Sequence, residues 1–264
     1  MIRLIVTGAC GRMGATVLRL AAADPAFVVT HIIEAKDHPL VGTRMDVPGV
    51  RDATFPLEYD LAGCIDDSDV IVDFSEAKAT IGHFRIAADK AKAIVVGTTG
   101  MSREAAEEMG RTKDAKAVVS PNMSIGVNLL FNLAEKAARV LGRDYDAEII
   151  EMHHKWKKDA PSGTASRLRD VIKHVEPERA WIDVTGREGM VGERKSDEIA
   201  VLALRGGDIV GEHTVFFAGA GERIELTHRA YSRENFARGA LVAAKWLVNQ
   251  QNGVYDMADV LGLR

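Results

Sequence analysis

The first 120 residues alternate between short apolar runs and segments whose hydrophobic residues follow helical spacing. The apolar runs have the length and β-branched composition of buried parallel strands, and the segments between them read as amphipathic helices. Strands that alternate with helices favour a parallel sheet with right-handed crossovers. We therefore predict an α/β fold based on a Rossmann-type, doubly wound parallel sheet, with strands at residues 2–6, 27–33, 69–74, 93–97 and 117–120.

The pattern changes after residue 124. Two amphipathic helices and three strand-like runs follow, at residues 124–141, 164–174, 198–204, 209–217 and 223–228. Glycine-rich turns separate the three runs, so we expect hairpins between consecutive antiparallel strands. This pattern of helices followed by consecutive strands predicts a second, α+β domain that carries a mixed or antiparallel sheet.

The two patterns divide the chain into residues 1–124 plus 234–264 and residues 125–233. The first domain is expected to be discontinuous, because a last amphipathic helix, with Ser232 as its cap, can pack back on the first sheet. Residues 36–66 are expected to form a loop with one short strand. Residues 183–197 follow no pattern that we recognise.

Composition excludes several classes of protein. The 264 residues are 47% hydrophobic, enough for packed cores, and a formal net charge of −4 gives no basic field for nucleic acid. No apolar run reaches the roughly 18 to 20 residues that span a bilayer. The first residues run directly into a strand pattern without the layout of a signal peptide, and two cysteines make no disulfide framework. We expect a cytoplasmic protein that binds neither membrane nor nucleic acid.

The turn after the first strand has the composition of a dinucleotide site. It reads Thr7-Gly-Ala-Cys-Gly-Arg-Met-Gly14, with Ala9 at the first glycine of G-x-G-x-x-G, and Glu34 ends the second strand. Glycines let the backbone approach a pyrophosphate at a helix N-terminus, and the acidic side chain accepts hydrogen bonds from the ribose. The alternative is an ordinary glycine-rich turn with a solvated glutamate. The candidate cofactor contacts are Gly8, Ala9, Cys10, Gly11, Arg12, Met13 and Glu34.

Two later segments also follow strand ends. Ligands of parallel sheets bind beyond the carboxyl ends of the strands, so these segments are candidates to line a cofactor. Simple turn chemistry explains their composition equally well. They are Gly97, Thr98 and Thr99, and Ser120, Pro121, Asn122 and Met123.

The richest segment chemically is Glu151-Met-His-His-Lys-Trp-Lys-Lys-Asp-Ala-Pro-Ser-Gly-Thr-Ala165. It joins a strand end to a helix N-terminus, where anions and catalytic groups collect. His153 and His154 should point to opposite sides of the strand, so we expect no metal bound by both. One imidazole suits proton transfer and the other binding, and Lys157 suits proton donation or a carboxylate contact. Ser162 and Thr164 are expected to add a second anion-binding face. The alternative is a solvated basic loop.

These segments together resemble the 4-hydroxy-tetrahydrodipicolinate reductase (dihydrodipicolinate reductase) family over nearly the whole chain. The resemblance rests on residues 8–14, 97–100, 122–128 and 151–165. It implies a Rossmann domain that binds NADPH or NADH and a second domain that binds substrate and builds a homotetramer. The implied reaction reduces a small dicarboxylate, (2S,4S)-4-hydroxy-2,3,4,5-tetrahydrodipicolinate, to tetrahydrodipicolinate with loss of water, in the diaminopimelate route to lysine.

The resemblance also implies roles by position. His153 corresponds to the catalytic acid/base and Lys157 to a proton donor, whereas substrate-carboxylate contacts correspond to His154, Gly163 and Thr164. Some relatives place an arginine directly after the acidic residue to grip the 2′-phosphate of NADPH, and Ala35 stands there in this chain. We therefore expect both cofactors to be used.

Two other functions fit part of the sequence. A Rossmann dehydrogenase of a small aldehyde or semialdehyde would not need a two-sided anion site. A regulatory protein that binds NAD(P)H without turnover would not need the pair of His153 and Lys157.

Overall fold

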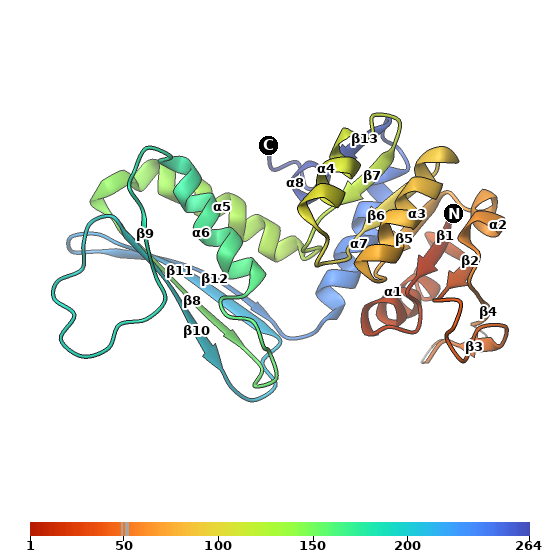
Figure 1. The fold of residues 1–264 in the computed structure, drawn as a ribbon, viewed down its shortest axis with the longest axis horizontal. Coiled ribbons are helices and arrows are strands. Elements are labelled where there is room, and N and C mark those ends of the chain that lie inside the picture. Colours follow the sequence, from red (N-terminus) through yellow and green to blue (C-terminus); the bar gives the residue numbers. More distant parts are fainter. Residues whose placement is uncertain (49, 51–52) are drawn as a thin grey trace. The chain divides into compact units, whose positions relative to one another are not determined.

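The computed structural model describes residues 1–48, 50 and 53–264 (Figure 1). These residues form two compact units, Met1–Ile125 with Arg233–Arg264 and Gly126–Ser232. The first unit is built on a mainly parallel sheet and the second on a smaller mixed sheet. The predicted α/β class, a Rossmann-type sheet with a second α+β domain, is confirmed. In the part of the chain that is described, every helix is too short or too polar to span a bilayer.

The sheet of the first unit has the order β13-β7-β6-β5-β1-β2-β4-β3. From β1 the chain adds strands first on one side, with β2, and then on the other, with β5, β6 and β7, which makes β1 the switch point at which such sheets bind ligands. In the described residues, neighbouring strands are parallel except β3 with β4. The strands are β1 (Ile2–Thr7), β2 (Phe27–Ile33), β3 (Arg44–Asp46), β4 (Thr54–Glu58), β5 (Val70–Asp73), β6 (Ala93–Val96), β7 (Lys116–Val119) and β13 (Gly253–Tyr255).

Helices cover both faces of this sheet, which explains why its strands are continuous apolar runs. Leu4 and Val6 of β1 belong to a core shared with α1 and α7, whereas Ile5 between them belongs to a second core shared with α3. The last long helix, α7, therefore belongs to the first unit. The helices of this unit are α1 (Arg12–Ala22), α2 (Leu61–Cys64), the 3-10 helix η1 (Ile65–Asp67), α3 (Ala77–Asp89), α4 (Arg103–Arg111), α7 (Glu234–Leu247) and α8 (Met257–Val260).

Two predictions for the first unit are wrong in detail. Residues 36–66 contain two strands, β3 and β4, rather than one, because these pair with each other and extend the sheet beside β2. Residues 49, 51 and 52 of that segment lie outside the described part. The residue before α7 is Arg233 rather than Ser232, and its side chain makes no capping hydrogen bond.

The second unit packs two helices on one face of its sheet (Figure 1). The sheet has the order β12-β11-β8-β10-β9, and alternate residues of its strands, such as Ile149 and Val215, are buried beneath α5 and α6. The elements are α5 (Ile125–Leu141), the 3-10 helix η2 (Gly142–Asp144), β8 (Asp146–His153), α6 (Gly163–Val175), β9 (Ile182–Val184), β10 (Glu198–Arg205), β11 (Gly211–Ala218) and β12 (Arg223–Ala230).

The predicted hairpin between β10 and β11 is wrong, because β8 lies between them. β8 pairs in parallel with β10 and antiparallel with β11. The turn that joins β10 to β11 crosses the end of β8, where the Gly206 N–H donates to the His153 carbonyl at 3.0 Å. Only the hairpin of β11 and β12 forms as expected. The end of β10 and the start of β11 therefore flank His153.

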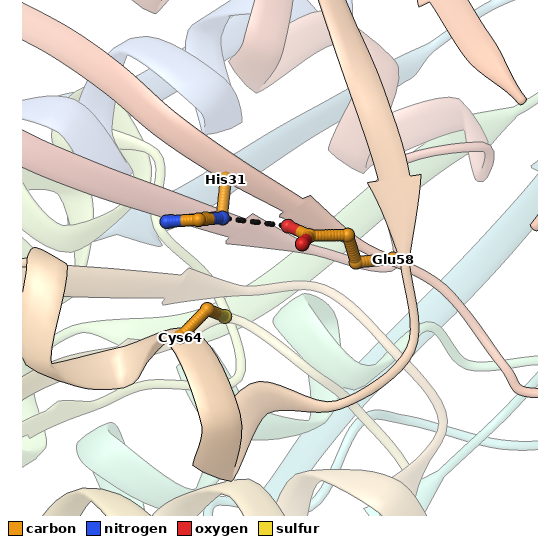
Figure 2. A group of neighbouring side chains, drawn as sticks. All are labelled: His31, Glu58 and Cys64. Carbon is orange, nitrogen blue, oxygen red and sulfur yellow. Dashed lines mark hydrogen bonds and ion pairs between the residues drawn. The ribbon is translucent and has the colours of Figure 1, made fainter. Parts of the chain in front are cut away.

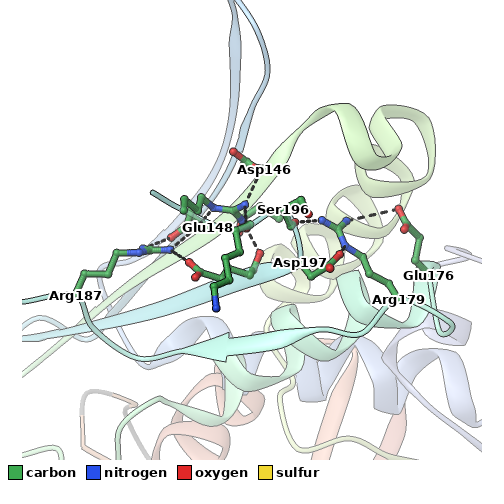
Figure 3. Close-up of polar contacts among 11 residues, drawn as sticks. Asp146, Glu148, Glu176, Arg179, Arg187, Ser196 and Asp197 are labelled. Atoms are coloured by element: carbon green, nitrogen blue, oxygen red, sulfur yellow. Dashed lines mark hydrogen bonds and ion pairs between the residues drawn. The ribbon is translucent and has the colours of Figure 1, made fainter. Parts of the chain in front are cut away.

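Segment 183–197 is attached to the second sheet by arginine–carboxylate pairs (Figure 3). Arg187 donates to Glu148 at 3.1 and 3.2 Å and to Glu198 at 2.9 Å. Arg194 donates to the same Glu148 at 2.8 Å. The hydrogen bonds that Arg187 donates to Glu148 and Glu198 raise its pKa above the usual range. Such pairs need no periodic spacing of residues. The sequence of this segment therefore shows no hydrophobic pattern, although its arginines hold it to the sheet.

Candidate active site

The predicted cofactor segments meet at one edge of the first sheet. The glycine turn follows β1, Glu34 follows β2, Gly97–Thr99 follow β6 and Ser120–Met123 follow β7. These strands are parallel, so their carboxyl ends share the edge at which open α/β sheets bind ligands.

The glycine turn has the shape that a dinucleotide needs. Gly8 has a φ of +67°, and a Cβ on Gly14 would lie 2.0 Å from the Gly8 carbonyl oxygen, so a side chain fits at neither point. Glu34 accepts hydrogen bonds from the N–H groups of Cys10 at 2.9 Å and Ala35 at 3.0 Å. Its carboxylate is thereby fixed beside the N-terminus of α1. This arrangement fits the pyrophosphate and ribose of a dinucleotide.

A buried aspartate organises the middle of the same edge. Asp73, at the end of β5, is fully buried. It accepts hydrogen bonds at 2.8 Å from the hydroxyl groups of Ser75, Thr80 and Thr98, and one at 2.5 Å from His83 Nδ1. Burial alone would raise the pKa of Asp73, but the bond from His83 and the other donors hold it well below its usual range. The network fixes the segment after β6 to the end of β5.

The residues predicted to contact the cofactor differ in how far they are exposed to solvent. Buried side chains such as Thr98, which is bonded to Asp73, can offer a ligand only their backbone groups. The buried residues are Gly8, Ala9, Gly97, Thr98, Ser120 and Met123; the partly buried ones are Cys10, Met13, Glu34 and Asn122; the exposed ones are Gly11, Arg12, Thr99 and Pro121.

The predicted substrate residues of the second unit surround another buried carboxylate. Glu151 of β8 has no exposed surface. It accepts hydrogen bonds from His153 Nδ1 at 2.6 Å and from the Ser162 N–H at 3.0 Å, and both guanidinium Nη atoms of Arg205 donate to it at 2.8 Å. Burial alone would raise the pKa of Glu151, but the bonds from His153 and Arg205 lower it to about 2. One ionised carboxylate therefore joins β8, β10 and the start of α6.

A second histidine lies beside His153. The ring of His213 meets that of His153 edge-on, with their centroids 5.2 Å apart, and its Nε2 lies 3.1 Å from Ser162 Oγ. Burial lowers the pKa of His213 to about 3, with the nearby His153 as a smaller cause. His213 is therefore neutral at physiological pH and adds no positive charge beside His153.

Hydrogen bonds hold the loop after β8 in place. Lys157 pairs with Asp159 at 2.9 Å, and the carbonyl of Asp159 accepts a bond from Arg205 at 2.8 Å. The Lys155 N–H donates to the Gly207 carbonyl at 3.2 Å. The loop is thereby tied to the turn between β10 and β11, and Lys157 within it is half-buried.

The other predicted substrate contacts differ in their surroundings. His154 packs against Trp156, and its Nδ1 is buried without a hydrogen-bond partner in the described residues. Gly163 and Thr164 form the first turn of α6. Ser162 does not add to an anion-binding face as expected, because its N–H donates to Glu151 and its hydroxyl accepts the Ala165 N–H.

A further cluster of ligand-type side chains lies in the first unit (Figure 2). Nδ1 of His31 donates to Glu58 at 2.6 Å, and Nε2 lies 3.5 Å from Asp67. Cys64 is close to both His31 and Glu58. Burial, and then the nearby carboxylates, raise the pKa of the Cys64 thiol to about 12. The contacts of His31 join β2 to β4 and η1, so we assign this cluster a structural role.

Sequence reasoning missed the partners that organise each site. Glu151 lies two residues before His153 on one strand, and this spacing could have revealed that their side chains share a face. Arg205 and His213 come from other strands and carry no local signal. Their positions follow only from the insertion of β8 between β10 and β11.

Together these features define a class of protein. A dinucleotide turn on a parallel sheet, combined with a histidine and a lysine beside a helix N-terminus, characterises a nicotinamide-dependent oxidoreductase. Family models then specify the family. Residues 2–123 match the N-terminus of dihydrodipicolinate reductase, and residues 126–261 match its C-terminus. The chain belongs to the dihydrodipicolinate reductase family, whose members use NAD(P)H.

Individual relatives agree with this assignment, and the resemblance noted in the sequence is confirmed. The chain is 46% identical to 4-hydroxy-tetrahydrodipicolinate reductase of Syntrophus aciditrophicus, with 100% of each chain covered. It is 47% identical to the reductase of that name from Anaeromyxobacter dehalogenans, with 100% and 99% covered. A solved structure of dipicolinate-bound dihydrodipicolinate reductase from Paenisporosarcina sp. TG-14 shares the fold, with a TM-score of 0.80, 24% identity, and 98% and 99% of the chains covered.

The buried state of His213 predicts a pH dependence of stability. The pKa is about 3 in the folded chain and about 6.5 when unfolded, so between these values only the unfolded chain binds the proton. The contribution of His213 is complete above pH 6.5 and is lost as the pH falls, by about 1.4 kcal/mol per pH unit. Urea unfolding between pH 6.5 and 4.5 measures this slope. It should become shallower in His213→Gln and stay unchanged in His174→Gln, an exposed control; equal slopes in all three proteins would contradict the account.

Proposed function

We propose that this chain catalyses the NAD(P)H-dependent reduction of (2S,4S)-4-hydroxy-2,3,4,5-tetrahydrodipicolinate to (S)-2,3,4,5-tetrahydrodipicolinate with loss of water, in the diaminopimelate route to lysine. The observation that carries the proposal is the pair of His153 and Glu151, at 2.6 Å, which the Ser162 N–H links to the N-terminus of α6 and Arg205 links to the loop that carries Lys157. Relatives that are 46% and 47% identical over the whole chain carry the name of this reductase.

The cofactor supplies the hydride when it is bound. We assign its pyrophosphate to Gly8–Met13 at the N-terminus of α1, and its adenosine ribose to Glu34, whose carboxylate is already oriented by backbone N–H groups. Gly97–Thr99 and Ser120–Met123 are assigned to the rest of the cofactor, because they follow parallel strands at the same edge. The network around Asp73 holds the first of these segments rigid.

Proton transfers are assigned to His153 and Lys157. Loss of water from the substrate gives a conjugated imine, and hydride addition to that imine leaves negative charge that a proton must quench. His153 donates its Nδ1–H to Glu151, so Nε2 is the atom that exchanges protons with the substrate. Lys157, held in the loop by Asp159, is assigned as the proton donor.

The two substrate carboxylates need cationic or N–H partners. His154 is assigned to one of them, and its buried Nδ1, which has no partner in the described residues, supports this. Gly163 and Thr164 are assigned to the second carboxylate, because a helix N-terminus presents N–H groups and a partial positive charge. Lysines 155, 157 and 158 add to the attraction.

Replacing His153 by Gln removes the titrating group and is expected to lower kcat about 10²- to 10⁴-fold. The loss of NAD(P)H absorbance with freshly generated substrate measures kcat. His174→Gln, on the exposed side of α6, is the matched control. Lys157→Ala should lower kcat and raise the substrate KM. Turnover of His153→Gln at the rate of the unmodified chain would remove His153 from the mechanism.

The surroundings of Glu34 predict the use of both cofactors. Its carboxylate suits a free ribose hydroxyl and repels a 2′-phosphate, whereas Arg12 and Lys36 attract one. We expect the kcat/KM values for NADH and NADPH to differ by less than about a hundredfold, or roughly 2.7 kcal/mol. The same absorbance assay with each cofactor gives the ratio. A larger advantage for NADPH would show that Glu34 does not set the preference.

We also propose that the chain forms a homotetramer through the second sheet. The face of that sheet opposite α5 and α6 carries apolar side chains in register: Leu202 lies opposite Ile150, and Leu204, opposite Met152, is 49% exposed. A second copy of the chain is the occupant that the family resemblance implies.

A cytoplasmic location is supported by two free cysteines, which suit a reducing compartment.

A further inference from the structure

The hydrogen-bond partners of Glu151 belong to different parts of the site. Its Oε2 accepts from His153 and Arg205, and its Oε1 accepts from Arg205 and the Ser162 N–H. The same Arg205 holds the Asp159 carbonyl, and Asp159 pairs with Lys157. A single buried group is thus linked to the candidate acid/base, to the candidate proton donor and to the start of the helix that receives a substrate carboxylate.

The hydrogen bond to Glu151 determines which ring nitrogen of His153 can exchange protons with a substrate. An ionised carboxylate only accepts hydrogen bonds, so Nδ1 must carry the hydrogen and Nε2 is left for proton exchange. Space beside Nε2 is kept by Gly211, because a Cβ there would lie 3.0 Å from this nitrogen. The ring is therefore oriented by Glu151 at Nδ1, and the lack of a side chain at Gly211 leaves room beside Nε2.

Arg205 neutralises the charge of the Glu151 carboxylate. The guanidinium group binds both carboxylate oxygens at 2.8 Å, so the pair of Glu151 and Arg205 has no net charge. His153 thus donates a directed hydrogen bond to a carboxylate whose negative charge is already paired. Neutral His213 on the far side adds no opposing charge.

We propose that Glu151, with Arg205, is a positioning residue for the reductase reaction: it selects the Nδ1–H tautomer of His153 and fixes the start of α6 against the same ring. This inference rests on the proposed function for its catalytic consequence. It assigns Glu151 no contact with substrate or cofactor.

Glu151→Gln tests the proposal in the full chain. A glutamine offers one acceptor oxygen and an NH₂ group that only donates, so it cannot satisfy His153, Ser162 and Arg205 together. We expect kcat to fall about 10²- to 10⁴-fold, as when a catalytic histidine loses its orienting carboxylate. The substrate KM should change less, and the acid side of the pH–kcat profile should move. Nitrogen NMR of the His153 ring should show the Nδ1–H form in the unmodified chain and its loss in the variant.

Glu58→Gln is the matched control, because Glu58 holds His31 Nδ1 at the same 2.6 Å in the first unit. It should leave kcat and the His153 ring signals unchanged. A folded Glu151→Gln protein that keeps both its kcat and the Nδ1–H form of His153 would overturn the proposal. Equal losses of kcat in Glu58→Gln and Glu151→Gln would also overturn it, by showing only general destabilisation.

Gly211→Ala keeps the proposal testable if Glu151→Gln does not fold. It leaves Glu151 and Arg205 intact and crowds the Nε2 side of the His153 ring, so kcat should fall at least about tenfold with an unchanged KM for the cofactor. Full activity in Gly211→Ala would contradict Nε2 as the working atom. A different result would reject the proposed function and leave the orienting bond established. In that case the unmodified chain shows no turnover, yet its His153 is in the Nδ1–H form and Glu151→Gln loses that form.

Discussion

An ionised carboxylate is costly to bury unless it is paired and fully hydrogen-bonded, and the second unit buries Glu151 completely. That constraint draws its partners together: the imidazole of His153 from the same strand, the guanidinium of Arg205 from β10 and the N–H of Ser162 from the start of α6. The strand order makes this possible, because β8 lies between β10 and β11. A simple hairpin of β10 and β11 would separate Arg205 and Gly211 from His153.

The first unit also contains a buried, fully hydrogen-bonded carboxylate, with different donors. Asp73 is buried at the end of a strand and takes its hydrogen bonds from hydroxyl groups and an imidazole instead of a guanidinium. It fixes the segment assigned to the cofactor, as Glu151 fixes the segment assigned to the substrate. In both units, a fully buried carboxylate supports the segment and is itself assigned no contact with the ligand.

Local patterns in the sequence predicted much of this. The parallel sheet was recognisable because strands buried on both faces are continuous apolar runs, and the glycine turn because Gly8 and Gly14 have no room for a side chain. The place of β8 was not predictable, because the glycines at 206 and 207 look like a hairpin turn and pairing between distant strands leaves no local pattern. Arg205, His213 and the cluster of His31, Glu58 and Cys64 were missed for the same reason.

We propose that the segment from His153 to Thr164 holds a dicarboxylate. Titrating the full chain with dipicolinate, a planar pyridine that bears two carboxylates, while following backbone amide and imidazole signals by NMR, tests it most directly. The account predicts saturable shifts at the Gly163 and Thr164 amides and at the His154 ring, and much weaker ones with picolinate, which has a single carboxylate. Shifts confined to the glycine turn of the first unit, or equal responses to both compounds, would contradict it.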